Sequence, residues 1–410
     1  MIEVKDLVSR LNIKIPSKLE AEAKILVIED QTDMRLIIVH HLNKLSFKSI
    51  KQFSNGLEAL EWLRASSQDV AITICDQEMP VMGGFDFLDE VKADRSLSRG
   101  PFAICIDNPD RAKIMLATES GVDGILVKPF TLKDVIPKLR EAFKIYHNPN
   151  NPELLYQKAK DNLRDDKLDE AEAIYKALSA MTEKAARPIV GLADVAILRK
   201  DYAAAEKLLQ QAEERNKNYV HTYVIRGNMY GEQNKIEEAI AEFKKAIDLS
   251  PLNPVRYERA AELLFSLKKF EEAVEILSVA LKNELEFPSL HHYLSQAYYS
   301  LKNYKKAIRH IRSSLNADPE NISYLNQLGI AYKESDEVEE ALKTYNQVIK
   351  LDPENRAALY NKAILLKSKG DVDGAIKLLD RCLTKHPDFA QAKEKLNEFK
   401  SDDVSKEAAS

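Results

Sequence analysis

The sequence predicts a doubly wound α/β domain followed by an all-α array of helical repeats. Three observations support this prediction. Short apolar runs alternate with helical periodicity from residue 24 to 146, which is typical of a parallel sheet covered by helices on both faces. Two prolines and three asparagines then interrupt both patterns within residues 146–152. After residue 152 the pattern is helical throughout and recurs every 34 residues, which indicates stacked helix pairs.

Residues 1–23 form an N-terminal extension. Their apolar side chains have near-helical spacing until Pro16 interrupts the pattern. We expect this extension to pack against its own domain; a contact between two copies of the chain in a homodimer is the alternative.

The α/β domain, residues 24–146, divides into five strands and five helices. The strands are expected at 24–28, 48–53, 70–75, 102–105 and 124–127, and the helices at 33–45, 54–65, after 84, from about 110, and at 131–145. Apolar runs of this length, bounded by turn residues, are typical of strands buried on both faces. Ser54 is expected to cap the second helix, and Leu57, Leu60 and Leu63 to face inward from it.

Charged residues follow three of these strands at the point where each one ends. Glu29 and Asp30 follow the first strand, Asp76 ends the third, and Lys128 ends the fifth. In open parallel sheets, ligands bind at the carboxyl ends of the strands. Clustered carboxylates suit Mg²⁺, a lysine suits a phosphoryl oxygen, and an aspartate can act as a nucleophile toward phosphorus. The sequence therefore predicts a magnesium-dependent phosphoryl site at this edge.

These residues resemble the receiver domain of two-component response regulators. Asp30 precedes Asp76 by 46 residues and Lys128 follows it by 52, while Met79-Pro80 and Gly83-Gly84 complete the pattern. The resemblance covers roughly residues 22–146. It implies a flavodoxin-like sheet of strand order 2-1-3-4-5.

The resemblance also implies a role for each site residue. Asp76 would be the phosphoacceptor and Lys128 would bind the phosphoryl group. Asp30, Asp76 and the backbone carbonyl of Glu78 would hold Mg²⁺, with Glu29 assisting. A sensor histidine kinase or a phosphotransfer protein would be the phosphoryl donor in a bacterial phosphorelay.

Four positions depart from the receiver pattern. Receivers usually carry Ser or Thr after the fourth strand, and Ile106 stands there in this chain. The usual aromatic residue of the fifth strand is replaced by Ile125, while Asp107 adds negative charge beside the pocket and Asn108 offers a substitute hydrogen bond. We therefore expect the phosphorylation chemistry to be retained and the conformational read-out to be altered.

The C-terminal part is periodic in small and large residues. Alanine recurs at intervals of 34 residues, at Ala171, Ala205, Ala239, Ala273, Ala307, Ala341 and Ala375. The residue four positions later is always large and apolar, and the residue twelve positions earlier is always small. Such small residues are expected where two helices cross closely.

This pattern resembles tetratricopeptide repeats. Seven repeats would span residues 152–387, joined to the receiver by a linker at 147–151, and closed by a capping helix at 388–400 before a disordered tail at 401–410. The first helices would line a concave, protein-binding groove. Its candidate residues are polar and aromatic: His221, Asn228, Arg259, His292, Gln296, Tyr299, Asn326 and Tyr360.

Composition and charge argue against several classes of function. The net charge is −5 and neither half is basic, which argues against nucleic-acid binding. Three unpaired cysteines and the lack of a long apolar segment or signal sequence indicate a cytoplasmic protein without membrane insertion. His291 and His292 are adjacent and would point about 100° apart on a helix, so a metal site in the array is not expected.

Two functions remain open at this stage. The first is a response regulator whose output is protein binding by the repeats. The alternative is an atypical receiver that acts as a phosphoryl sink or as a docking inhibitor of a kinase–regulator pair, with little phosphorylation-dependent switching. No enzymatic activity is expected beyond the receiver's own phosphorylation and dephosphorylation.

Overall fold

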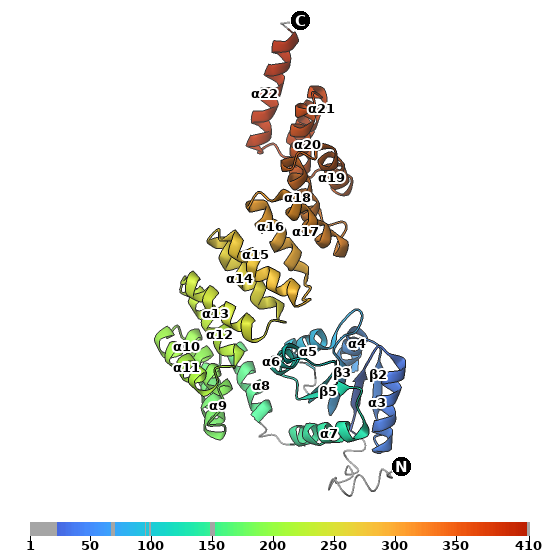
Figure 1. Ribbon diagram of the computed structural model, residues 1–410, viewed down its shortest axis with the longest axis vertical. Helices are drawn as coiled ribbons and strands as arrows, with labels where there is room; N and C mark the ends of the chain where they lie inside the picture. The colour runs from blue at the N-terminus through green and yellow to red at the C-terminus, as the bar shows by residue number, and fades with distance from the viewer. Residues whose placement is uncertain (1–22, 67–69, 95, 98–99, 148–151, 408–410) are drawn as a thin grey trace. The chain divides into compact units, whose positions relative to one another are not determined.

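The computed structural model of the chain describes residues 23–66, 70–94, 96–97, 100–147 and 152–407. These residues form two compact units (Figure 1). One unit comprises the described residues up to 234 together with 248–252, and the other comprises 235–247 together with the described residues from 253 onward. The predictions for residues 1–22 and for the linker at 148–151 fall outside the described residues.

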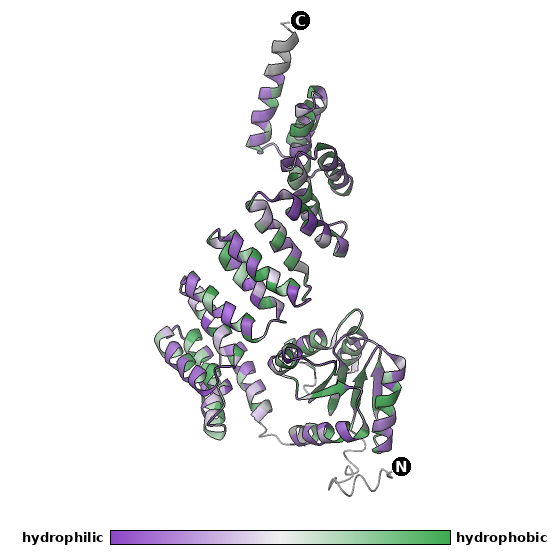
Figure 2. Ribbon diagram, viewed as in Figure 1, coloured by the Kyte–Doolittle hydropathy of each residue, from purple (hydrophilic) through white to green (hydrophobic). Residues whose placement is uncertain are grey.

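A five-stranded parallel sheet forms the centre of the N-terminal domain. Its strands are β1 Ile25–Ile28, β2 Ile50–Phe53, β3 Ile72–Asp76, β4 Phe102–Asp107 and β5 Gly124–Lys128. All neighbouring strands pair in parallel, in the order β2-β1-β3-β4-β5, which confirms the predicted order. The strands are hydrophobic along most of their length (Figure 2), as expected for a sheet covered on both faces.

Helices cover both faces of this sheet. They are α3 Thr32–Lys44, α4 Gly56–Ser66, α5 Gly84–Ala93, α6 Arg111–Glu119 and α7 Leu132–His147. Side chains of α3 and α7 pack in the core on one face, and side chains of α4, α5 and α6 in the core on the other. Right-handed crossovers between parallel strands place helices in this way.

Two predictions for α4 were wrong. Leu57 is 37% exposed, because Gly56, Ala59, Leu60 and Leu63 form the inward face of the helix and Leu57 falls outside it. Ser54 does not cap the helix: the backbone N–H of Glu58 donates to Asn55 Oδ1 at 3.0 Å, while the Ser54 hydroxyl donates to the Glu58 carboxylate at 3.0 Å.

The rest of the chain is helical, as predicted. The first unit contains α8 Pro152–Arg164, α9 Leu168–Met181, α10 Arg187–Leu198, α11 Tyr202–Arg215 and α12 Val220–Glu232. The helices that follow are α13 Ile236–Leu249, α14 Pro254–Ser266, α15 Phe270–Lys282, α16 Pro288–Ser300, α17 Tyr304–Ala317, α18 Ile322–Glu334, α19 Val338–Leu351, α20 Arg356–Ser368, α21 Val372–Lys385 and α22 Ala390–Glu407. Helix α22 passes the predicted end at Lys400, since no glycine or proline interrupts residues 390–407.

The turns between paired helices share one backbone conformation. A residue with positive φ recurs every 34 residues, at Asp166, Lys200, Asn234, Lys268, Lys302, Asp336 and Gly370. A left-handed residue after a helix satisfies its last carbonyl groups, and glycine adopts that conformation most easily. Six of these seven residues are not glycine, so glycine spacing in the sequence does not reveal the turn.

The small residues allow close helix crossings, as predicted. A Cβ added at Gly329 of α18 would lie 2.5 Å from the Tyr345 ring of α19. Tyr345 itself is fully buried. The crossing therefore depends on the absence of a side chain at residue 329.

Among the described residues, no helix combines the length and the apolar character that crossing a bilayer requires.

The Gly329–Tyr345 crossing predicts a position-specific stability loss. Gly329→Ala should destabilise the protein by about 1–3 kcal/mol, because the added methyl group overlaps a ring that has no room to move. Urea unfolding followed by circular dichroism measures the change. Gly231→Ala is the matched control: no atom lies within 4 Å of its added Cβ, and alanine favours the helix by about 0.5–1 kcal/mol. Equal effects of the two substitutions would contradict the close crossing.

Candidate functional site

The sheet brings the predicted charged residues together at one edge. In the strand register, Ile28 lies beside Cys75, Asp76 beside Cys105, and Asp107 beside Lys128. Glu29 and Asp76 therefore extend from neighbouring strand ends, and Lys128 comes from the far side of β4. The carboxyl ends of the central strands form the site, as expected for an open parallel sheet.

Lys128 connects these side chains. Its Nζ lies 2.8 Å from Asp76 Oδ1 and 3.0 Å from Glu29 Oε2, and 3.8 Å from Asp107 Oδ2. The lysine is buried. Burial lowers the pKa of Lys128, but the hydrogen bonds with Asp76 and Glu29 outweigh burial and hold the pKa above its ordinary value. The ammonium group is thus charged at neutral pH.

The pKa values of the two carboxylates paired with Lys128 are also raised, but for a carboxyl group this shift favours the neutral form. Glu29 is fully buried and Asp76 is 4% exposed. Burial raises the pKa of both groups above their ordinary values, and the contact with Lys128 offsets only part of that rise. The pocket therefore favours additional positive charge.

The donor set fits a divalent cation. Glu29, Asp30 and Asp76 each offer a carboxylate oxygen, and these oxygens lie within 4.8 Å of one another. In the described part of the chain, Asp30 Oδ1 is buried and accepts no hydrogen bond. Hard cations such as Mg²⁺ prefer oxygen ligands of this kind together with water. A buried acceptor without a donor indicates that this oxygen is available as a ligand.

Arg35 of α3 supports the acidic loop and was not singled out from the sequence. Its Nη1 donates to the carbonyl oxygen of Glu29 at 2.5 Å and to that of Asp30 at 3.3 Å. These bonds fix the backbone from which two of the carboxylates extend. The sequence feature that could have identified Arg35 is its place in the first turn of the helix that follows Glu29 and Asp30.

The loop after Asp76 requires glycine at its end. A Cβ at Gly84 would lie 2.2 Å from the carbonyl oxygen of Asp76, and the Gly84 N–H donates to the carbonyl of Gln77 at 3.0 Å. Between them, Val81 has φ of 70° and is 78% exposed. A β-branched residue with positive φ is strained, so this loop stores backbone strain next to the site.

The positions that depart from the receiver pattern lie around the site. Ile106 is fully buried in the core beneath the pocket, and Asp107 is exposed next to Lys128. Asn108 adopts a left-handed conformation with φ of 44°. Ile125 is half-buried and packs on the same core as Ile106. A hydroxyl group is therefore missing at residue 106, where the resemblance would place one.

The side chain of Glu78 points away from the carboxylate cluster. It is 74% exposed and lies 3.3 Å from Lys113 of α6. The predicted role of its backbone carbonyl as a metal ligand stays a prediction. Lys113 also donates to the carbonyl of Asp107 at 3.4 Å, so it links the loops after β3 and β4.

The predicted groove residues all lie on the first helices of their repeats: His221, Asn228, Arg259, His292, Gln296, Tyr299, Asn326 and Tyr360. In the second unit several of them contact one another or the next repeat. His292 Nε2 lies 3.1 Å from Gln296 Nε2, and the Asn326 amide donates to Asn355 at 3.2 Å. Polar and aromatic side chains thus occur on the first helix of each of these repeats.

Two histidines approach each other in the fifth repeat. The Nδ1 atoms of His291 on α16 and His310 on α17 are 3.0 Å apart. The sequence pattern pointed only to His291 with its neighbour His292, because the members of this pair lie on different helices. Burial, together with the charges of His291, Arg309 and Lys306, lowers the pKa of His310 to about 4. His310 is therefore neutral at pH 7.

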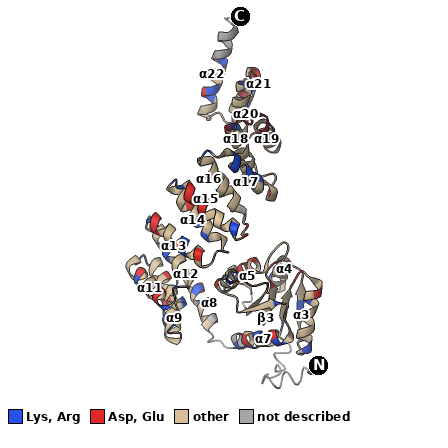
Figure 3. Cartoon of the chain, viewed as in Figure 1, with Lys and Arg blue, Asp and Glu red and all other residues tan. Residues whose placement is uncertain are grey.

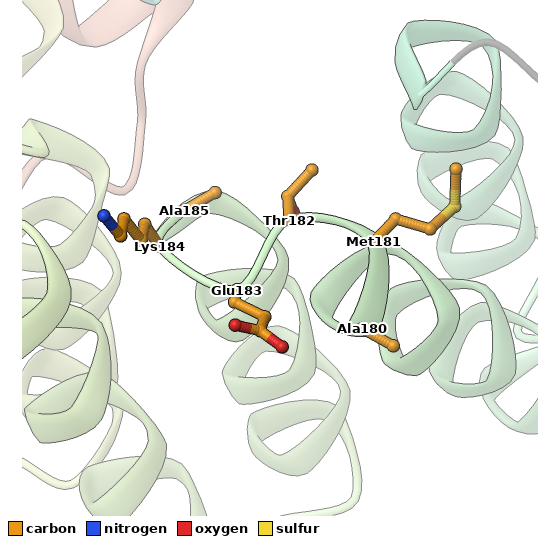
Figure 4. A pocket seen from close by; sticks show the side chains of 6 residues that line it. All are labelled: Ala180, Met181, Thr182, Glu183, Lys184 and Ala185. Carbon is orange, nitrogen blue, oxygen red and sulfur yellow. The ribbon is translucent and has the colours of Figure 1, made fainter.

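A surface hollow lies at the turn between α9 and α10, away from the acidic site. It is lined by residues 180–185, and Figure 4 shows the side chains of Glu183 and Lys184 pointing in different directions. None of the predicted site residues lines it, and its polar side chains do not converge.

Comparison with known families identifies both parts of the chain. Residues 25–140 match the response regulator receiver domain. Tetratricopeptide repeats match at residues 191–254, 232–292, 288–321 and 332–397.

Individual relatives cover the N-terminal part. The chemotaxis protein CheY-3 of Vibrio cholerae is 34% identical over 126 residues, which is 31% of this chain and 95% of that protein. The chemotaxis protein CheY1 of Helicobacter pylori is 34% identical over 116 residues, covering 28% of this chain and 93% of that protein. Among solved structures, YrrB, a tetratricopeptide-repeat protein described as having an unusual peptide-binding site, is similar at 23% identity and a TM-score of 0.41; the match covers 46% of this chain and 96% of YrrB.

The burial of Lys128 predicts a pH-dependent stability loss on its removal. Lys128→Met should cost about 3–5 kcal/mol at neutral pH, because Asp76 and Glu29 lose their counter-charge. The folded-state pKa values of both carboxyls lie above the ordinary ones and rise further in the variant. The folded state then favours their protonated forms, so stability is lost as pH rises through these pKa values and regained toward about pH 4.

Urea unfolding at several pH values measures this effect. Trp62 is the only tryptophan of the chain and lies in α4, so its fluorescence reports on the receiver. Lys113→Met is the control, because its exposed pair with Glu78 should contribute less than about 1 kcal/mol. A loss for Lys128→Met that does not change with pH would contradict the assignment.

Proposed function

Since the chain belongs to the response regulator receiver family and continues into tetratricopeptide repeats, we propose that it is a response regulator that accepts a phosphoryl group on Asp76 and acts through protein binding by its repeats. The phosphoryl donor is a sensor histidine kinase or a phosphotransfer protein, as for other two-component receivers. The protein works in the cytoplasm, and its only catalysis is the transfer of phosphoryl groups onto and off its own aspartate.

One observation carries this proposal: the Lys128 ammonium lies 2.8 Å from an oxygen of Asp76, in a pocket with three carboxylates. Three negative charges against one positive charge favour a divalent cation in the same pocket. Mg²⁺, when bound by Glu29, Asp30 and Asp76, neutralises charge on the transferred group.

The chemistry of the protein's own groups follows from their positions. An Asp76 carboxylate oxygen attacks phosphorus and forms a new P–O bond, while the bond from phosphorus to the donor breaks and the donor leaves with that electron pair. Lys128 is already within hydrogen-bond distance of Asp76, so its ammonium can hold a phosphoryl oxygen once the group arrives. The phosphoryl group carries about −1.5 to −2 charge by analogy with other phosphorylated side chains and replaces the single charge of the Asp76 carboxylate, so the net increase in negative charge draws Lys128 from Glu29 and Asp107.

The array provides the output of this receiver. Its groove-lining helices present polar and aromatic groups such as Gln296, Tyr299 and Tyr360. Stacked repeats of this kind form extended binding surfaces. We assign the groove to a protein partner whose affinity changes with the state of Asp76.

The phosphoacceptor can be tested directly. Incubation of the full-length protein with acetyl phosphate and Mg²⁺ should give one acid-labile phosphoryl adduct, detected by intact mass spectrometry. Asp76→Asn should give none, because the amide lacks the nucleophilic oxygen, whereas Asp107→Asn should keep the adduct. Removal of Mg²⁺ with EDTA should abolish the reaction. An equal adduct on Asp76→Asn would rule out the assignment.

One observation favours a second function, in which the receiver is a phosphoryl sink or a docking inhibitor of a kinase–regulator pair. Ile106 is fully buried where receivers usually present a hydroxyl group to the phosphoryl oxygens. Without that hydroxyl, the phosphoryl group has fewer ways to move the fourth strand and the helix after it. Phosphorylation would then change little outside the pocket.

Hydrogen exchange distinguishes the two functions. With beryllofluoride as the phosphoryl mimic, the switching function predicts altered exchange in α6 and in the array, because Lys128 leaves Asp107 and frees the loop before α6. The sink function predicts changes confined to the pocket loops. Ile106→Thr restores a hydroxyl and should extend the change in α6, with Trp62 fluorescence checking that the receiver stays folded. If exchange in α6 is the same with and without beryllofluoride in the wild type, the switching function fails.

A further inference from the structure

Helix α17 reverses the charge found at the start of its neighbours. The two residues before the repeated alanine are Glu237-Glu238 in α13, Glu271-Glu272 in α15 and Glu339-Glu340 in α19. In α17 they are Lys305-Lys306. Across all seven repeats, no other second helix has a basic residue at either position.

The reversal extends over one surface, which we call the α17 basic face. It consists of five exposed residues: Lys302, Lys305, Lys306, Arg309 and Arg312. No acidic residue occurs from 302 to 317. In Figure 3, α17 carries blue basic segments, whereas α13 and α15 carry red acidic segments.

The α17 basic face has no carboxylate to neutralise it. In the described part of the chain, none of its five residues lies within ion-pair distance of an acidic group. Two of them contact aromatic residues: the Lys306 ammonium lies 5.0 Å from the centre of the Tyr298 ring, and Arg312 lies 5.6 Å from the centre of the Tyr332 ring and donates to the Tyr332 hydroxyl. The glutamates of the neighbouring helices differ in this respect, since Glu272 pairs with Lys244 at 3.0 Å.

This arrangement is unfavourable for the helix itself. Positive side chains in the first turn oppose the positive end of the helix dipole, whereas the glutamates of the other repeats complement it. Lys305 and Arg309 are four residues apart, and like charges at that spacing destabilise a helix by about 0.2–0.5 kcal/mol. The charge also acts on a neighbour, because Arg309 and Lys306 add to burial in lowering the pKa of His310. Local stability therefore does not explain the basic residues.

We propose that the α17 basic face binds an acidic peptide segment of a partner protein. A helix of 14 residues is about 21 Å long, which matches a short extended peptide. The neighbouring helices α15 and α19 start with paired glutamates, so negative charge lies on both sides of the basic face. A flat anionic membrane or a DNA duplex would meet this negative charge, whereas a narrow peptide avoids it.

A second copy of this chain is a poor candidate for the partner that binds the α17 basic face. Four of the six glutamates that start α13, α15 and α19 already pair with lysines of their own chain, for example Glu237 with Lys269 at 3.8 Å and Glu340 with Lys343 at 2.8 Å. The partner therefore brings its own uncompensated carboxylates. This binding does not depend on Asp76. The test of peptide binding and the test of phosphorylation can therefore fail separately.

A fluorescein-labelled octaglutamate peptide tests the proposal by anisotropy with the full-length protein at low salt. The variant Lys305→Glu with Lys306→Glu gives α17 the residues of the neighbouring repeats, so the helix should fold as well as before. It should bind the peptide on the order of tenfold more weakly, because two attractions become repulsions. The control is Lys377→Glu with Lys393→Glu, which changes the net charge equally at two exposed lysines of α21 and α22. It should bind like the wild type.

Three results would overturn the proposal. The first is equal affinity of the wild type and the Lys305/Lys306 variant. The second is an equal loss in both double variants, which would show an effect of net charge alone. The third is stronger binding to phosphatidylserine vesicles or to duplex DNA than to the peptide, with that binding lost in the Lys305/Lys306 variant. Circular dichroism melting confirms that each variant is folded, and Lys305→Gln with Lys306→Gln, which removes charge without reversing it, should give an intermediate affinity.

Discussion

A lysine ammonium buried between carboxylates is the interaction on which the receiver half depends. Lys128 lies within 3.0 Å of both Asp76 and Glu29 at the ends of three parallel strands. Removing these charges from water is costly, and only their mutual proximity offsets that cost. The same electrostatics make the site reactive: burial raises the pKa of both carboxyls, so the pocket is stabilised by whatever brings more positive charge. Stability and chemistry thus have one origin, and the strand order is what brings these three groups to one edge.

The array depends on a different constraint, which is steric. Each repeat has to bring two helices close together, and the chain does so by placing a small residue against a large one, as at Gly329 and Tyr345. The repeats also provide an internal reference, because equivalent positions occupy equivalent environments. Against that reference, the two lysines at the start of α17 differ from the paired glutamates of three other helices. A charge pattern that would be unremarkable in an isolated helix is therefore informative here.

Much of this structure could be predicted from the sequence, because it follows from the topology of parallel sheets and from the period of the repeats. The carboxyl ends of parallel strands share one edge of a sheet. The convergence of Asp76, Glu29 and Lys128 at that edge could therefore be predicted from the sequence. The 34-residue spacing located the helix pairs in the same way. The predicted strand order and the predicted helical repeats were both confirmed.

Other features depend on details that the sequence does not encode locally. Leu57 was assigned to the core of α4, but the inward face is set by neighbouring elements, and a helix rotation of one residue changes what is buried. The pairing of His291 with His310 joins two helices, and the bonds of Arg35 go to backbone carbonyls, which every residue has, so the sequence does not identify its partners. The left-handed turn at Lys302 and its equivalents is imposed by helix geometry on residues that do not prefer it.

The close contact between Gly329 and Tyr345 has a consequence for how the number of repeats can change. The glycine at 329 and the tyrosine at 345 belong to the same 34-residue unit, so both travel together when a whole unit is copied or deleted. A recombination joint between units leaves this pair matched, whereas a joint inside the turn at 335–337 would set the first helix of one unit against the second helix of another. A tyrosine could then face an alanine or a serine, and the helices would have to separate. The pair of Tyr175 in α9 with Gly191 in α10 differs, because it joins two successive units. Joints between units therefore preserve the crossing at residues 329 and 345, but one between α9 and α10 would also have to keep a small residue opposite Tyr175.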